Sequence, residues 1–232
     1  MNSYIEPLNE IYCKNANTDN AFWEKKYMRN QFEFFGIRTP IRAEFNKTFF
    51  KQYKLPVQNE IKNIVYELWN LPQREFQYFA LDLLFKSEKI WDKNFIEIFE
   101  NIIVQKSWWD TVDYIAARLI GDYFLKYPEN ILKYTEKWMN SQNIWLQRSA
   151  LLFQLKYKKN TNFDLLTQYI IKLKESNEFF IQKAIGWILR EYSKVEPEKV
   201  WRFASTVKLK PLSEREAKRI IQKKFPAIAI ES

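Results

Sequence analysis

The chain has 232 residues, of which 47% are hydrophobic and 18% aromatic, and this composition excludes an intrinsically disordered protein. It holds no histidine, three glycines and a single cysteine, Cys13, which argues against histidine-based triads, disulfides, metal clusters and glycine-rich phosphate loops. The formal net charge of +9 suits a polyanionic partner, although a basic cytosolic protein of another kind can carry the same excess. We therefore expect no metal and no cofactor, and a reducing, cytoplasmic setting.

The chain reads as a succession of helices with short breaks at prolines. Valine, isoleucine, tyrosine and phenylalanine recur at helical spacing, and no Asn-Gly or Asp-Gly hairpin signal occurs. The apolar runs are shorter than the roughly 18 residues that a membrane helix needs, and the N-terminus lacks the pattern of a signal peptide. The pattern predicts an all-α protein without membrane spans. The breaks fall at Pro40, Pro56, Pro72, Pro128, Pro197 and Pro211.

Similar segments recur thirty-five residues apart. Leu146-Gln147-Arg148 matches Ile181-Gln182-Lys183, and Phe76-Gln77-Tyr78 stands two periods before the first of these. A period in the mid-thirties with two helices per repeat is typical of a HEAT-like helical solenoid, whose concave face is lined by one helix of each pair. We expect one such domain over 1–225, with equivalent helices starting near residues 41, 76, 108, 144 and 178. A short tail, 226–232, is expected to be disordered.

The helix predicted over 107–119 presents two chemically different faces. Trp109 lies roughly 90° from the centre of its apolar stripe, and Asp113 lies further out, one turn later. Ala116 completes this face and leaves room beside the other two residues. We therefore expect Trp109 and Asp113 outside the core. The stripe that we expect to be buried consists of Trp108, Val112, Ile115 and Leu119.

The helix predicted over 179–192 repeats this arrangement. Trp187 lies roughly 130° from the centre of the apolar stripe, between Lys183 and Arg190. One interpretation is a tryptophan that packs on the stems of its basic neighbours. The other is an aromatic surface for a ligand, with flanking cations for phosphates.

A carboxylate between two tryptophans and several bases can serve glycosidic chemistry. Glycosidic bonds break through an oxocarbenium-like transition state, whose positive charge a carboxylate such as Asp113 stabilises. Indole faces also attract cations, and lysine and arginine bind the phosphate backbone without regard to sequence. The alternative is a non-catalytic HEAT-like solenoid that binds DNA or a protein partner, in which a lone acid among bases has no particular role.

The sequence resembles the AlkD family of DNA alkylation-repair glycosylases over nearly its whole length, from about residue 20 to 215. The resemblance implies a HEAT-like solenoid that wraps duplex DNA and hydrolyses the N-glycosidic bond of cationic alkylated purines, chiefly 3-methyladenine and 7-methylguanine. It also implies a monofunctional enzyme of base excision repair that does not flip the damaged base and that follows DNA into the bacterial nucleoid. The segments that carry the resemblance are 35–40, 107–113, 143–148 and 178–192.

The resemblance places the catalytic cleft at Trp109, Trp187 and Asp113, and an arginine near the lesion strand at Arg148. Two departures lie in the N-terminal repeats. Arg38 stands where a glutamine is expected, and Ala43 follows Arg42 where the family usually shows an arginine pair. We expect a monomer that takes duplex DNA with alkylated bases as its partner. The DNA-binding residues that we assign are Arg148, Lys183, Arg190, Lys156, Tyr27 and Arg38.

Overall fold

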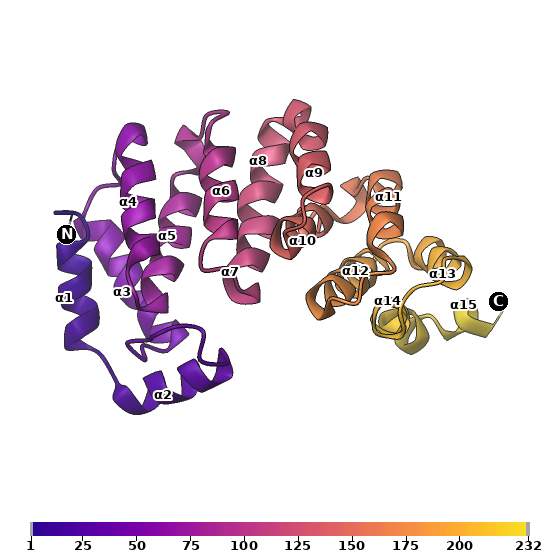
Figure 1. The fold of residues 1–232 in the computed structure, drawn as a ribbon, viewed down its shortest axis with the longest axis horizontal. Coiled ribbons are helices and arrows are strands. Elements are labelled where there is room, and N and C mark those ends of the chain that lie inside the picture. The colour runs from indigo at the N-terminus through magenta and orange to yellow at the C-terminus, as the bar shows by residue number, and fades with distance from the viewer. Residues whose placement is uncertain (1, 231–232) are drawn as a thin grey trace. The chain divides into compact units, whose positions relative to one another are not determined.

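The computed structural model describes residues 2–230, and these residues fold into helices joined by short connections (Figure 1). Within this range no strand forms, apart from an isolated bridge between Glu33 and Gln73. None of the described helices has the length and apolarity needed to span a membrane. The all-α prediction is therefore confirmed.

The helical repeat is also confirmed. The five helices expected to be equivalent begin at residues 39, 74, 109, 144 and 179, so each starts thirty-five residues after the one before. Contacts divide the chain into two compact units, Met1–Ile98 and Phe99–Ser232. The single domain over 1–225 and its concave basic face stay predictions.

The first unit packs aromatic rings between its helices. Phe49 and Phe79 are fully buried and meet edge to face with ring centroids 5.1 Å apart, while Trp69 is buried nearby in sequence at the end of α4. Aromatic pairs of this geometry add to the stability that burial provides. The helices of this unit are α1 (Glu6–Lys14), α2 (Thr18–Tyr27), α3 (Thr39–Gln52), α4 (Gln58–Asn70), α5 (Arg74–Lys86), the 3₁₀ turn η1 (Glu88–Ile90) and the start of α6 (Phe95–Val104).

The loop between α2 and α3 is fixed by a buried carboxylate. Glu75 of α5 accepts hydrogen bonds from the backbone N–H groups of Phe35, Gly36 and Ile37, at 2.9 to 3.2 Å. Gly36 has a φ of +80°, and a Cβ at this position would lie 2.1 Å from the carbonyl oxygen of Asn17. Only glycine fits this turn, which explains why glycine follows Phe35 in the sequence.

The second unit buries a further aromatic core, in which Phe124 lies against both Trp138 and Phe153. Its α10 is preceded by the N-cap residue Asn143, whose side chain accepts from the N–H groups of Trp145 and Leu146. The elements after α6 are α7 (Trp109–Tyr114), η2 (Ile115–Ile120), α8 (Gly121–Lys126), η3 (Pro128–Asn130), α9 (Ile131–Met139), α10 (Ile144–Leu152), η4 (Lys158–Asn160), α11 (Phe163–Leu173), α12 (Phe179–Tyr192), α13 (Pro197–Thr206), α14 (Pro211–Lys224) and α15 (Pro226–Ile230).

The first long helix of the second unit changes its winding half-way along. α7, η2 and α8 run without a break from Trp109 to Lys126, but residues Ile115–Ile120 wind as a π-helix. A π-turn accommodates more residues per turn than the α-helix on either side and often lies beside a functional site. Here it begins two residues after Asp113.

Helices α12 and α14 approach each other unusually closely, and they lie side by side in Figure 1. A Cβ on Gly186 of α12 would lie 2.6 Å from the Cβ of Glu216 and 3.0 Å from the carbonyl oxygen of Ser213. The absence of a side chain at Gly186 therefore brings Glu216 against α12. In the C-terminal tail, Pro226–Ile230 form the short helix α15, which contacts α13 and α14, while residues 231–232 lie outside the described part of the chain, and the expected disorder of the tail stays a prediction.

Candidate active site

Three equivalent helices of the second unit, α7, α10 and α12, line a hollow of about 330 Å³. It contains all three residues predicted to be catalytic and three of the predicted DNA-binding residues. Two phenylalanines that the sequence analysis did not single out complete the wall. The lining residues are Trp109, Asp113, Arg148, Phe179, Phe180, Lys183, Trp187 and Arg190.

Asp113 and Arg148 form a two-pronged ion pair at this hollow. Arg148 donates from Nε to Asp113 Oδ1 at 2.7 Å and from Nη2 to Oδ2 at 2.8 Å. Its remaining nitrogen, Nη1, donates to the carbonyl oxygen of Phe180. The pair fixes the plane of the carboxylate, since parallel bonds from a planar guanidinium leave it little freedom to rotate.

The sequence assigned Arg148 to DNA binding near the lesion strand, and this assignment stays a prediction. The Arg148 side chain is 5% exposed. In the structure its guanidinium faces inwards, where Asp113 and the first turn of α12 use its donors.

Asp113 is an acid in a largely desolvated setting, with 16% of its side chain exposed. Burial raises the pKa of the Asp113 carboxyl above its ordinary value, while the hydrogen bond and the positive charge of Arg148 oppose that rise. The nearby charge of Asp110 adds a smaller upward contribution. A carboxylate that is poorly hydrated, yet held ionised by one cation, interacts strongly with any further positive charge brought into the hollow.

The two tryptophans predicted to be catalytic, Trp109 and Trp187, are half-buried and both face the hollow. Trp108 differs from its expected burial in the core, because the helix begins one residue later and Trp108 has an extended backbone, with φ −157° and ψ 159°. It instead joins an aromatic cluster, with ring centroids 5.3 Å from Phe180 and 5.9 Å from Trp145. The rest of the predicted stripe, Val112, Ile115 and Leu119, is buried as expected, and Ala116 is buried as well.

The phenylalanines of the wall could have been found from the repeat. Phe179 and Phe180 occupy the same repeat positions as Ile144 and Trp145. Phe179 is 55% exposed, and Phe180 packs against Trp145 with ring centroids 4.8 Å apart. The sequence sign of these wall residues was therefore an apolar pair at the start of the helix, at the repeat positions of another apolar pair.

Lys183 and Arg190, both predicted to bind DNA, are held by a residue that the sequence analysis missed. Glu216 of α14 accepts from Lys183 Nζ at 3.0 Å through Oε1 and from Arg190 Nη1 through Oε2. No motif marks this glutamate. It stands thirty-five residues after Ile181, which is buried and apolar, so the repeat does not indicate a contact with Lys183 or Arg190, and only the packing of α14 against α12 brings Glu216 to them.

The other predicted DNA-binding residues lie elsewhere. Lys156 lines a separate hollow of the second unit, together with Arg118 and Lys158. Tyr27 and Arg38 belong to the first unit, where Tyr27 is 70% exposed and Arg38 donates from Nε and Nη2 to Asn20 Oδ1 at 3.2 and 3.0 Å. The helix that carries Tyr27, α2, buries none of its side chains and exposes Phe22 and Trp23 as well.

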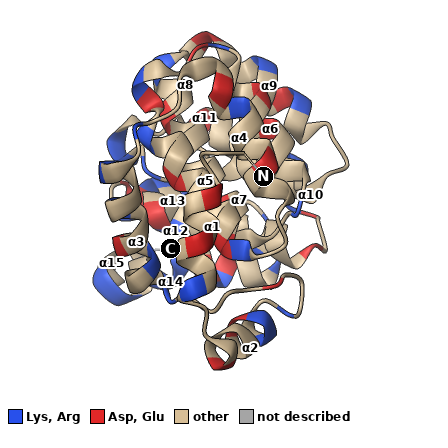
Figure 2. Cartoon of the chain, turned by 90° about the vertical axis from the view of Figure 1, so that its left-hand side faces the viewer, with Lys and Arg blue, Asp and Glu red and all other residues tan. Residues whose placement is uncertain are grey.

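Helix α2 of the first unit carries both acidic and basic side chains, and so it does not form a uniformly basic surface. Figure 2 shows residues of both signs along α2, where Asp19 and Glu24 stand beside Lys25 and Lys26.

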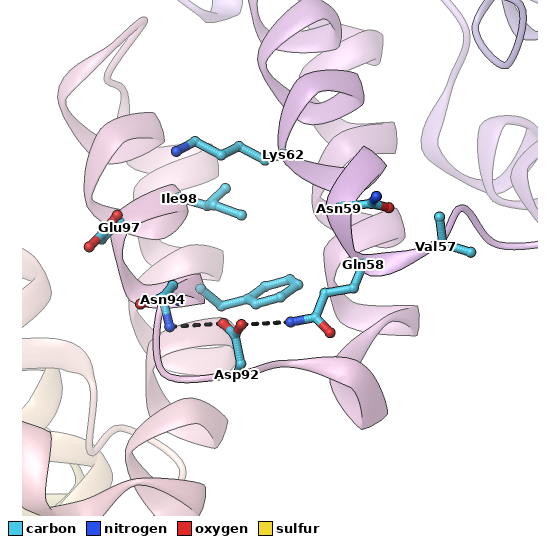
Figure 3. A pocket seen from close by; sticks show the side chains of 9 residues that line it. Val57, Gln58, Asn59, Lys62, Asp92, Asn94, Glu97 and Ile98 are labelled. Carbon is cyan, nitrogen blue, oxygen red and sulfur yellow. Dashed lines mark hydrogen bonds between the residues drawn. The ribbon is translucent and has the colours of Figure 1, made fainter.

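The first unit also contains a hollow of about 520 Å³ between the start of α4 and the start of α6 (Figure 3). Two carboxylates, Asp92 and Glu97, line this hollow. Asp92 accepts from Gln58 Nε2 at 2.6 Å and from the backbone N–H of Asn94 at 2.9 Å. Asp92 thus joins α4 to the turn before α6, and no tryptophan lines this hollow.

Comparisons with known proteins show the family to which the chain belongs. Residues 12–221 match the family described as DNA alkylation repair enzyme. A solved structure described as a predicted DNA alkylation repair enzyme from Enterococcus faecalis is similar to the chain, with a TM-score of 0.84 and 32% identity over 90% of this chain and 97% of the other. No curated protein matches the chain significantly.

Proposed function

Because this chain belongs to the family of DNA alkylation repair enzymes, we propose that it hydrolyses the N-glycosidic bond of cationic alkylated purines in duplex DNA. The observation that carries this proposal is the Asp113 carboxylate, held by Arg148 at a hollow between two tryptophans. The substrates are 3-methyladenine and 7-methylguanine, and the products are the free base and an abasic site.

Asp113 supplies the electrostatic stabilisation. As the glycosidic bond breaks, its electron pair moves to the base nitrogen, and positive charge builds up on the deoxyribose. A carboxylate about 4 Å from that charge, at an effective dielectric near 20, contributes about 4 kcal/mol. This is on the order of a thousandfold in rate. Asp113 also orients a water molecule, whose oxygen bonds to C1′ and whose proton passes to the carboxylate or to solvent.

The tryptophans and Arg148 complete the arrangement. Trp109 and Trp187 present indole faces to the sugar, and these faces attract a cation through their quadrupoles. Arg148 acts as a positioning residue, since its three guanidinium nitrogens donate to Asp113 and to the Phe180 carbonyl oxygen. The fixed carboxylate requires no reorientation when the charge develops, and this preorganisation is the main source of electrostatic catalysis.

The walls of the hollow favour a mechanism without base flipping. Enzymes that flip a base read its edge with hydrogen bonds in a closely fitting pocket. Here the walls are aromatic or cationic, and the guanidinium nitrogens of Arg148 are engaged by Asp113 and Phe180. The hollow suits a deoxyribose cation and its flanking phosphates better than the edge of a purine.

The substrate itself supplies the missing proton. The chain has no histidine, and Asp113 acts as an anion, so no evident acid protonates a neutral leaving base near pH 7. A 7-methylguanine already carries positive charge, which weakens its bond before binding. We therefore expect excision of cationic lesions and no release of hypoxanthine or uracil.

The decisive experiment uses a duplex oligonucleotide with one 7-methylguanine, incubated with excess protein while free base and abasic sites are measured. Matched duplexes with hypoxanthine or uracil at the same position serve as controls. Release of 7-methylguanine alone is the expected result. Binding without release would indicate a non-catalytic DNA-binding protein, and efficient release of hypoxanthine would overturn the mechanism.

A further inference from the structure

Glu216 of α14 does not line the hollow, yet it contacts two side chains that do. Its Oε1 accepts from Lys183 Nζ at 3.0 Å, and its Oε2 accepts from Arg190 Nη1. A third cation, Arg219, lies 4.0 Å from Oε2 and is 69% exposed. With 11% of its side chain exposed, Glu216 is the central anion of this cluster.

The two cations stand on one face of α12. Lys183, Trp187 and Arg190 follow one another at spacings of four and three residues, which places them in successive turns. The Glu216 carboxylate, with one oxygen for each cation, therefore holds the basic side chains on both sides of Trp187 along this face of α12. Long basic side chains are otherwise among the most mobile on a protein surface, and ordering one costs conformational entropy.

The cluster is built into the packing of the two helices. Gly186 lies between Lys183 and Arg190 in sequence, and any side chain there would collide with Glu216, because an added Cβ would be 2.6 Å from the Cβ of Glu216. Burial alone would raise the pKa of Glu216, but the hydrogen bond from Lys183 and the charges of Lys183, Arg190 and Arg219 outweigh it and lower the pKa. The carboxylate thus stays ionised wherever the protein is folded near neutral pH.

The ion pairs leave donors for a ligand. A lysine ammonium has three N–H groups and a guanidinium has five, and Glu216 accepts from one nitrogen of each residue. Lys183 and Arg190 can therefore bind Glu216 and a phosphate oxygen at the same time. Binding of DNA then requires no rupture of the existing pairs.

We propose that Glu216 is a positioning residue, which holds Lys183 and Arg190 on the rim of the hollow so that they bind the phosphates on either side of the damaged nucleotide. The proposal rests on the proposed function of the hollow. A purely structural role, in which Glu216 only joins α12 to α14, is the competing explanation. The two differ in how a change of Glu216 affects excision and DNA binding relative to stability.

The test replaces Glu216 by glutamine, which keeps the shape of the side chain and removes its charge. We expect single-turnover excision of 7-methylguanine from duplex DNA to fall about tenfold. Affinity for an undamaged duplex should rise slightly, and its dependence on salt should steepen by up to about one phosphate contact, since a negative charge has left the rim. Slower excision with equal or tighter binding supports positioning.

The matched control is Glu214→Gln, on the same helix and with the same change of charge. Glu214 is 44% exposed and pairs with Lys218 at 2.7 Å, away from the hollow. Excision at the wild-type rate is expected for this variant. A tenfold loss in Glu214→Gln as well would attribute the effect to net charge and overturn the proposal.

A double-mutant cycle separates positioning from folding. In a Lys183→Gln/Arg190→Gln background, adding Glu216→Gln should slow excision by less than about twofold, because the residues through which it acts are gone. An undiminished tenfold loss in this background would overturn the proposal. So would wild-type or faster excision in Glu216→Gln alone, and so would a joint loss of duplex affinity and melting temperature in that variant. If the wild type releases no 7-methylguanine, the proposed function fails, while the salt dependence of duplex binding still tests whether Glu216 governs the two cations.

Discussion

Two carboxylates of the second unit, Asp113 and Glu216, are each linked by hydrogen bonds to α12, and their pKa values are shifted in opposite directions. Their side chains are similarly exposed, at 16% and 11%. Asp113 has one partner cation, Arg148, which also donates to the Phe180 carbonyl of α12, and burial raises its pKa. Glu216 has Lys183 and Arg190 of α12 with Arg219 close by, and these cations lower its pKa. The number of cations that face a carboxylate, set against its desolvation, decides the direction.

This difference separates a reactive acid from an anchoring one. The charge of Asp113 is compensated by a single guanidinium and faces aromatic rings, so it still attracts a developing cation. The charge of Glu216 is more than compensated, and it acts on its neighbours and not on a substrate. Each of the following experiments changes one side of this comparison.

The largest effect is expected for Asp113→Asn. Excision of 7-methylguanine should fall by two to three powers of ten, roughly, because the charge that stabilises the sugar cation is lost. Duplex affinity should persist or rise, since a negative charge has left the surface that faces phosphate. Single-turnover release of the base at the wild-type rate would remove Asp113 from the mechanism. Glu216→Gln, with its expected loss of about tenfold, is the comparison on the other carboxylate.

A smaller effect distinguishes the cations that face DNA from the one that faces Asp113. Lys183→Ala should flatten the slope of log affinity against log salt by about one, because it removes a phosphate contact. Arg148→Ala should leave the slope unchanged but slow excision, since Arg148 is buried and orients Asp113. A salt titration of both variants checks this, and a flattened slope in Arg148→Ala would restore the direct phosphate contact that the sequence suggested.

The smallest effect concerns the pH dependence of stability. The pKa of Asp113 is raised in the folded state. Between the ordinary pKa of an aspartate and this raised value, the folded state therefore binds more protons than the unfolded state, and the contribution of Asp113 to stability falls as pH rises through its folded pKa. The lowered pKa of Glu216 has the opposite sign, because its stabilisation is present above the ordinary pKa of a glutamate and is lost as pH falls through its folded pKa.

Urea unfolding between pH 3 and pH 7, roughly the range in which carboxyl groups titrate, measures both contributions. The difference in unfolding free energy between wild type and Asp113→Asn should fall with pH. The difference between wild type and Glu216→Gln should rise with pH. Slopes of the same sign would contradict the opposite pKa shifts of the two groups.

Much of the fold could be predicted from the sequence because helical repeats impose a regular period. The starts of α3, α5, α7, α10 and α12 follow from segments that recur every thirty-five residues. Helical periodicity also set Trp109, Asp113 and Trp187 apart from the apolar stripes of two equivalent helices, and these three residues line one hollow. Their catalytic role was implied by the family resemblance and not by the periodic pattern.

The directions of individual side chains could not be predicted in the same way. Trp108 was placed in the core because helical periodicity was extended one residue too far, into extended backbone. The ion pair of Arg148 with Asp113 was not predicted, because the pattern on a single helix does not show a carboxylate that lies one repeat earlier. Glu216 lies on α14 at the repeat position of the buried Ile181, so the repeat does not predict its contact with Lys183 and Arg190. That contact depends on the close approach at Gly186, which only the packed helices reveal.

The π-turn at Ile115–Ile120 sets the rotation of α8 about the helix axis relative to α7. An inserted residue in an α-helix advances everything beyond it by about 100° unless a wide turn absorbs it. Trp109 and Asp113, before the wide turn, therefore face one hollow, while Arg118, within the wide turn, lines a different one. A deletion of one residue within 115–120 would tighten the turn into a regular helix and rotate the two ends against each other. Chain length in this stretch is consequently as important to the site as the identity of its side chains.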